Sequence, residues 1–233
     1  MLPSANGDNF IVAQFVYFTR IAKYLPDGRL DSSYGNAGYS DAANMSCTSA
    51  VMQGDKIIVA GSYFNSVFGS KAIAVARYTA NGILDSSFGV NGLVITDFYY
   101  LNDDDANSIV LQGDKIVVAG STVTFSNDFV LVRYTKNGTM DSSFGVNGKV
   151  TTDFNGSDDF GNSMTLQEGK FIVAGSTGDF PDFDFALARY NADGMLDSSF
   201  GVNGKVTTDF DNSADFATSI ALQGNRIIVG GET

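Results

Sequence analysis

The stretch Leu84-Asp85-Ser86-Ser87-Phe88-Gly89-Val90-Asn91-Gly92 decides the fold, because the chain repeats it. It returns almost unchanged at residues 140–148 and 196–204, and a weaker copy lies at residues 30–38. The aspartates at its second position, Asp31, Asp85, Asp141 and Asp197, are 54, 56 and 56 residues apart. A fixed period of this size indicates that one small structural unit is repeated along the chain.

Composition excludes several functional classes. The 233 residues carry 26 acidic and 14 basic side chains, a net charge of -12, so the surface is expected to repel nucleic acid. Histidine is absent, which removes the usual general base and the commonest metal ligand. The single cysteine, Cys47, rules out an internal disulfide and a multi-cysteine zinc site, and is most simply a small core residue.

One repeat, residues 148–191, contains four β-type runs separated by Gly, Asn, Asp and Ser: 149–154, 163–167, 171–176 and 183–190. Residues 167–170 predict a tight hairpin turn between the second and third runs. The third run is apolar on both faces in every copy (57–60, 116–119, 171–174 and 227–229), so it must be covered from both sides. Glycines follow it at 61, 120, 175 and 230, where a side chain would crowd the neighbouring backbone or block a positive φ.

These patterns predict an all-β protein, a β-propeller of about four four-stranded antiparallel blades with a period of about 56 residues. The whole chain, 1–233, is expected to form one domain. Long links at about 27–38, 81–92, 137–148 and 193–204 are expected to cross from the outer strand of one blade to the inner strand of the next.

A family resemblance supports this fold. The combination of residues 115–120, Lys-Ile-Val-Val-Ala-Gly, with the Ala-Arg-Tyr and Leu-Asp-Ser-Ser-Phe-Gly motifs of residues 188–201 resembles the bacterial delta-60 repeat family. The resemblance covers nearly the whole chain and implies a β-propeller at the cell surface or secreted, with no catalytic residues to carry over. Location is otherwise open, since the chain starts with no signal-like segment.

The ring can close in three ways. Five copies of the third run (the first at 10–15) accompany four long links, so four periods and one spare strand are present. A single chain could form a four-bladed ring in which residues 18–24 complete the blade begun by residues 205–231. Two chains could instead form an eight-bladed ring, or the chain could be part of a longer propeller. An unpaired apolar edge strand would favour self-association.

Residues that recur in every repeat are expected to be structural. Arg77, Arg133 and Arg189 can tie the links by bidentate hydrogen bonds, and the Asp-Ser-Ser segments suit side-chain-to-backbone turns.

Two loops per repeat vary, and both emerge at the same end of the blades. The predicted rim on that face is acidic and aromatic, which suits recognition of a protein or glycan: Tyr99, Tyr100, Asp103, Asp104, Asp105, Asp158, Asp159, Phe160, Phe180, Asp211 and Asp215. The alternative is that the phenylalanines plug the blade ends while the aspartates keep the loops solvated.

Alternating oxygen-bearing residues in two of these loops also suggest a calcium site, the only cofactor considered: Asp153, Asn155 and Asp159, then Asp209, Asp211 and Asp215. Neither loop has the glycine and glutamate of an EF-hand, and ordinary polar loops with Asx turns are the alternative.

Catalysis is not expected. Adjacent aspartates such as Asp158 and Asp159 rarely hold the separation that two-carboxylate chemistry requires. No run of 18 apolar residues is present, so insertion into a membrane is not expected. The prediction is therefore a non-catalytic binding module, with a structural, self-assembling repeat unit as the alternative.

Overall fold

The computed structural model describes residues 2–3, 9–14, 19–41, 45–66, 69–99, 102–211 and 213–233. Its strands are β1 (Leu2–Pro3), β2 (Asn9–Gln14), β3 (Thr19–Tyr24), β4 (Tyr39–Asp41), β5 (Met45–Gln53), β6 (Lys56–Asn65), β7 (Ser70–Tyr78), β8 (Leu93–Thr96), β9 (Asp104–Gln112), β10 (Lys115–Val123), β11 (Asn127–Tyr134), β12 (Lys149–Thr152), β13 (Asp158–Gln167), β14 (Lys170–Asp179), β15 (Asp182–Tyr190), β16 (Lys205–Thr208), β17 (Phe216–Gln223) and β18 (Arg226–Glu232). Among the residues described, no helical segment has the length and apolarity needed to span a bilayer.

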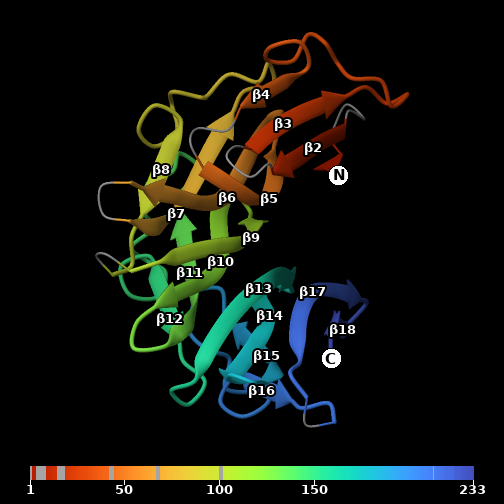
Figure 1. Ribbon diagram of the computed structural model, residues 1–233. Coiled ribbons are helices and arrows are strands. Elements are labelled where there is room, and N and C mark those ends of the chain that lie inside the picture. Colours follow the sequence, from red (N-terminus) through yellow and green to blue (C-terminus); the bar gives the residue numbers. More distant parts are fainter. Residues whose placement is uncertain are drawn as a thin grey trace.

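The strands form four four-stranded antiparallel sheets and one two-stranded sheet. The complete sheets, called blades 1 to 4, have the orders β1-β2-β3-β4, β5-β6-β7-β8, β9-β10-β11-β12 and β13-β14-β15-β16, and β17-β18 starts a fifth. The blades follow one another along an arc, with blade 1 and β18 at its two ends (Figure 1). This arrangement confirms the predicted all-β propeller with four-stranded blades.

The first strand of each sheet is the innermost. β5 packs beside β9, β9 beside β13, and β13 beside β17. Side chains fasten these strands to the next backbone: Asn107 Nδ2 donates to the Gly161 carbonyl at 2.9 Å, and Asn162 Nδ2 donates to the Ala217 carbonyl at 2.9 Å. The inner wall is therefore held by hydrogen bonds between blades as well as by packing.

The predicted boundary between blades was wrong. The strand that follows each long link does not open the next blade but returns to its own sheet, as β12 pairs with β11 and places Val150 opposite Leu131. The link reverses the chain, because Asn147 and Gly148 adopt positive φ values of 53° and 93°. The crossing between blades is instead the short segment after Thr152.

The core lies between the blades. In β10, Ile116 and Val118 face blade 2, whereas Val117 and Ala119 face blade 4. Successive residues of a strand point to opposite faces, so a strand covered on both sides must be apolar throughout. This confirms the prediction for β6, β10 and β14. β18 differs, since Ile228 is 49% exposed.

The recurring glycines prevent a backbone clash. A Cβ on Gly61, Gly120 or Gly175 would lie 1.8 Å from a carbonyl oxygen of the inner strand, beside a β-bulge. None of the three has a positive φ, so the second proposed reason was wrong. In the last sheet Gly231 occupies this position, and not the predicted Gly230. A Cβ on Gly230 would have no atom within 4 Å.

Of the three ways of closing the ring that the sequence left open, the single-chain closure through residues 18–24 does not occur. β3 lies between β2 and β4 in blade 1, and does not complete the last sheet. In the described part of the chain β18 pairs only with β17, which leaves its other edge open.

Candidate functional site

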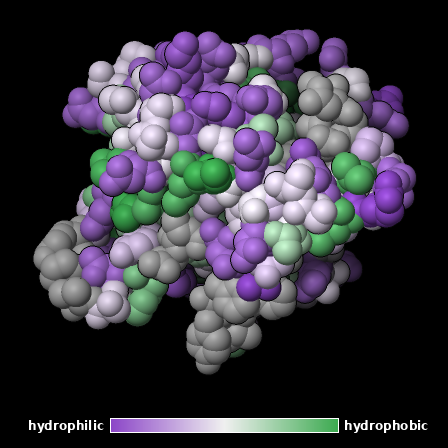
Figure 2. All heavy atoms as spheres, turned by 90° about the horizontal axis from the view of Figure 1, so that it is seen from above, coloured by the Kyte–Doolittle hydropathy of each residue, from purple (hydrophilic) through white to green (hydrophobic). Residues whose placement is uncertain are grey.

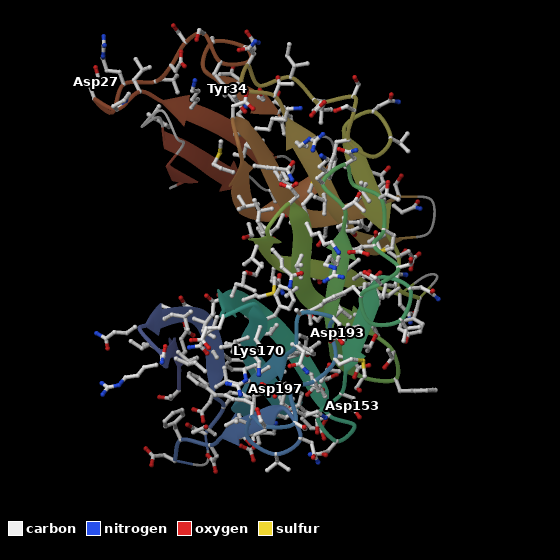
Figure 3. The ribbon with its side chains drawn as sticks, turned by 180° about the vertical axis from the view of Figure 1, so that it is seen from behind. Asp27, Tyr34, Asp153, Lys170, Asp193 and Asp197 are labelled. Carbon is white, nitrogen blue, oxygen red and sulfur yellow. The ribbon has the colours of Figure 1, made fainter. Side chains whose placement is uncertain are left out.

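The face that carries the long links is stabilised by a repeated ionic cluster. Arg77, Arg133 and Arg189 each donate through Nε to Oδ2 of the aspartate of the following link, at 2.8 Å. A lysine reaches the same oxygen, as Lys170 does at 2.6 Å from Asp197 (Figure 3). Each guanidinium also lies over the phenylalanine of its link, 4.5 to 4.7 Å from the ring centroid.

These clusters are structural, as predicted for the recurring arginines, but the bond to the aspartate is not bidentate, because Nε and Nη2 bind different residues of the link. Arg133 binds Asp141 through Nε and Ser143 through Nη2. Hydrogen bonds from Lys115 and Ser143, together with Arg133, hold the pKa of Asp141 well below its usual range. Consecutive links also bond to one another, as the Gly145 amide donates to the Asp193 carbonyl at 2.7 Å.

On the opposite, variable face, three predicted rim aspartates fasten neighbouring blades. Asp103 accepts from the Lys71 amide at 2.8 Å. Asp105 accepts from the Ser62 hydroxyl at 2.8 Å and pairs with the Lys71 ammonium at 3.2 Å. Asp158 accepts from the amide and side chain of Asn127, both at 2.9 Å.

Three further predicted rim residues, Asp104, Asp159 and Asp215, are 0% exposed. Each accepts through Oδ2 from a backbone amide on the preceding crossing: Phe98 at 2.8 Å, Phe154 at 2.6 Å and Phe210 at 2.7 Å. These carboxylates therefore hold the crossing segment between two blades in place, and they are not exposed on the predicted rim. Their positions were predictable as loop residues, whereas their burial depends on the packing of the next blade.

Burial raises the pKa of Asp104 and of Asp159 to about 6. Hydrogen bonds from Thr122 and the Phe98 amide limit the rise at Asp104, and the hydrogen bond from the Phe154 amide limits it at Asp159. Nearby carboxylates raise the pKa further, Asp97 at the first site and Asp153 with Asp128 at the second.

The acidic residues named in the calcium prediction do not gather as the loop spacing suggested. Asp153 and Asp159 lie together with Asp128, and Asp209 and Asp215 lie together with Asp184. The alternating residues Asn155 and Asp211 instead adopt left-handed turns, with φ of 68° and 64°. Asp128 and Asp184 were missed because they come from β11 and β15, far from the loops in sequence. The sequence signal that could have identified them is their separation of 56 residues, which equals the repeat period.

Aromatic side chains project from the same face. Phe64, Phe125 and Phe180 stand at the equivalent hairpin ends of blades 2, 3 and 4, and they are 57%, 109% and 90% exposed. Tyr99, on a crossing, is 45% exposed. Phe160 instead packs on Phe183, with ring centroids 6.0 Å apart. The predicted rim residue Tyr100 lies outside the described residues.

Hollows that sequence reasoning did not predict lie beside the outermost strands. One has a volume of about 540 Å³ and is lined by residues that include Phe98, Tyr99, Lys149 and Met195. A second, of about 390 Å³, repeats it one blade later between Phe154 and Lys205. Because equivalent residues line both, the hollows follow from blade packing. In the view from above, apolar patches lie among hydrophilic groups (Figure 2).

The fold and the two unlike faces define a β-propeller repeat protein. Residues 53–88, 112–144 and 168–200 match the family model described as "Domain of unknown function (DUF5122) beta-propeller". Each matched segment runs from an inner hairpin turn to the link of the same blade.

Solved structures show the same fold. The Bombyx mori GH32 beta-fructofuranosidase superposes with a TM-score of 0.52 at 12% identity, over 96% of this chain and 52% of that one. A mutant of that enzyme in complex with sucrose gives a TM-score of 0.50 at 12% identity, over 94% and 50%. The chain thus spans about half the length of these structures, and likeness at this identity concerns the fold alone. No curated protein matches the chain.

Proposed function

We propose that this propeller is a non-catalytic binding module that recognises a protein or glycan through aromatic side chains on its variable face. One observation carries the proposal: three consecutive blades place a phenylalanine at the same hairpin end, each more than half exposed. Exposure of large aromatic groups is costly unless a partner covers them, and their planes suit both sugar faces and apolar protein side chains.

The surrounding aspartates support a recognition role over a catalytic one. Asp103, Asp105 and Asp158 already hold neighbouring strands, and Asp104 and Asp159 are buried. Carboxylates engaged in this way position the hairpins from which the phenylalanines project. The acidic rim predicted from the sequence therefore becomes, in this proposal, a scaffold for an aromatic one.

The test compares two variants with the native chain on a glycan array and by quantitative affinity capture. Phe125→Ser with Phe180→Ser removes the two most exposed aromatic groups. Val146→Ser with Val202→Ser is the matched control, since both valines are 77% exposed and belong to the long links on the other face. Ligands lost with the phenylalanine variant and kept with the valine variant support the proposal. Ligands retained equally by both would contradict it.

A second candidate function, self-assembly, is favoured by the open edge of β18. Within the described residues this strand pairs on one side only, and Ile228 is 49% exposed. Unpaired apolar edges add strands from other chains. Light scattering after size exclusion should then give more than one chain per particle, reduced by Ile228→Lys but not by Ile95→Lys, a 48% exposed residue of the outer strand β8. A monomer at all concentrations would exclude it.

A further inference from the structure

Two groups of three aspartates, each assembled from three segments, lie at consecutive blade junctions. In the first, Asp128 of β11, Asp153 of the crossing and Asp159 of β13 each bring one carboxylate oxygen within 4.8 Å of the others. The second group consists of Asp184, Asp209 and Asp215 in the same arrangement, each 56 residues further along the chain. The repeat period thus reproduces the arrangement at two junctions.

Hydrogen bonds occupy one oxygen of each carboxylate in the first group and leave the other available. Asp128 accepts through Oδ2 from the Thr124 hydroxyl at 2.7 Å. Asp153 accepts through Oδ1 from the Gly156 amide at 2.6 Å, and Asp159 through Oδ2 from the Phe154 amide at 2.6 Å. These hydrogen bonds fix the positions of the three carboxylates and leave one oxygen of each free to bind an ion.

A buried oxygen without a partner marks both groups. Asp159 Oδ1 and Asp215 Oδ1 are inaccessible to solvent and accept no hydrogen bond, and both residues are 0% exposed. A buried polar atom normally has a partner, because its desolvation is otherwise uncompensated. No described ion pair involves the carboxylates of Asp128, Asp153 or Asp159; the nearby Lys205 ammonium donates to the backbone carbonyl of Asp153 instead.

The preceding junction supplies an internal comparison. Asp97 and Asp104 correspond to Asp153 and Asp159 there, but Ala72 stands where the third aspartate would be. At this junction the buried Oδ1 of Asp104 does accept a hydrogen bond, from the Thr122 hydroxyl. The unpartnered oxygen therefore occurs where the third carboxylate is present.

We propose that each group binds one Ca²⁺ ion, which joins the third strand of one blade to the inner strand of the next. Ca²⁺ takes oxygen ligands at 2.3–2.6 Å, so oxygens bound to one ion lie within about 5 Å of each other, as these do. Asp153 is exposed, which leaves an open side for waters to complete the six to eight ligands. Each ion is bound by the one unpartnered oxygen of its group, Asp159 Oδ1 or Asp215 Oδ1, and offsets the repulsion among the three carboxylates.

Calorimetric titration of the chelator-treated full chain with CaCl₂ tests the proposal. The native protein should bind two ions, Asp128→Asn and Asp184→Asn one each, and the double variant none. Asp97→Asn, at the junction with two aspartates, is the matched control and should still bind two. The melting temperature of the native protein should rise with CaCl₂, and that of the double variant should not change. Absence of binding at millimolar CaCl₂, or a stoichiometry that Asp128→Asn and Asp184→Asn leave unchanged, would overturn the proposal.

Discussion

The hydroxyl groups of Thr96 and Tyr134 lie 2.6 Å apart and join the outermost strand of blade 2 to the third strand of blade 3. Tyr190 and Thr152 repeat the contact one blade later, at 2.8 Å. Tyr134 and Tyr190 are both fully buried. A hydrogen bond between hydroxyls in the interior thus connects strands that belong to different sheets.

Removal of one hydroxyl should destabilise the protein measurably. Tyr134→Phe leaves Thr96 buried without its partner, so the free energy of unfolding should fall by about 1 to 2 kcal/mol. Adding Thr96→Val removes the remaining polar group, and the double variant should lose less than the sum of the single variants. Urea denaturation of the four proteins measures this, and strict additivity would contradict the coupling.

The two cations at each link aspartate should contribute unequally. The Arg133 side chain is 5% exposed and also contacts Phe144, whereas the Lys115 side chain on the same Asp141 oxygen is 43% exposed. Arg133→Ala should lower the free energy of unfolding by about 3 kcal/mol, because it breaks a buried pair. Lys115→Ala should cost less than about 1 kcal/mol. Equal losses in thermal denaturation would show that burial does not distinguish the two contacts.

Stability should increase as the pH falls from 7 to 5. Asp104 and Asp159 have pKa values of about 6, above those of an unfolded chain, so the folded state binds protons more tightly in this range. The gain is about 1 to 2 kcal/mol for each carboxyl, allowing for solvent screening, and it is lost as the pH rises through 6.

Below about pH 4 the direction should reverse. The pKa values of Asp85, Asp141 and Asp197 are lowered, so protonation of these groups favours unfolding. Urea denaturation in metal-free buffer at pH 3, 5 and 7 measures both effects. Asp104→Asn is the diagnostic variant, and an unchanged difference between pH 5 and 7 in this variant would remove Asp104 as a cause.

A third cation site should be obtainable by one substitution, if the calcium proposal is correct. Ala72→Asp places a carboxylate beside Asp97 and Asp104 at the junction that lacks one. Without calcium the variant should be less stable than the native protein, because another carboxylate is buried. With CaCl₂ it should bind three ions. Ala72→Asn is the neutral control and should bind two.

Repetition made the fold predictable but not the division into blades. The apolar third run and the hairpin turns specify which strands pair within residues 45–78, and these features are local in sequence. The position of Lys149–Thr152 depends on whether the preceding link turns back or continues, which the left-handed conformations of Asn147 and Gly148 decide. The backbone conformation of these two residues thus determines which sheet the strand joins.

The candidate site was predicted only in part, for a related reason. Aromatic and acidic residues were assigned to one face because strand direction alone determines the end at which a loop emerges. Whether an aspartate points outward or inward depends on neighbouring blades: Asp158 bonds to Asn127, while Asp159 is buried. Asp128 was overlooked because it is an isolated acid in a strand, and only packing brings it to Asp153.

The ionic clusters at the long links give the row of blades a direction. Arg77 Nη1 donates to the Lys136 carbonyl at 2.5 Å, and Arg133 Nη1 donates to the Ala192 carbonyl at 2.6 Å, so each arginine is completed by the blade that follows. The Arg189 side chain, which in the described structure has no such carbonyl, is 20% exposed, against 5% for the other two. Cooperativity in such an array passes between nearest neighbours. Fraying should therefore begin at blade 4 and β18, and amide exchange should slow progressively toward β10.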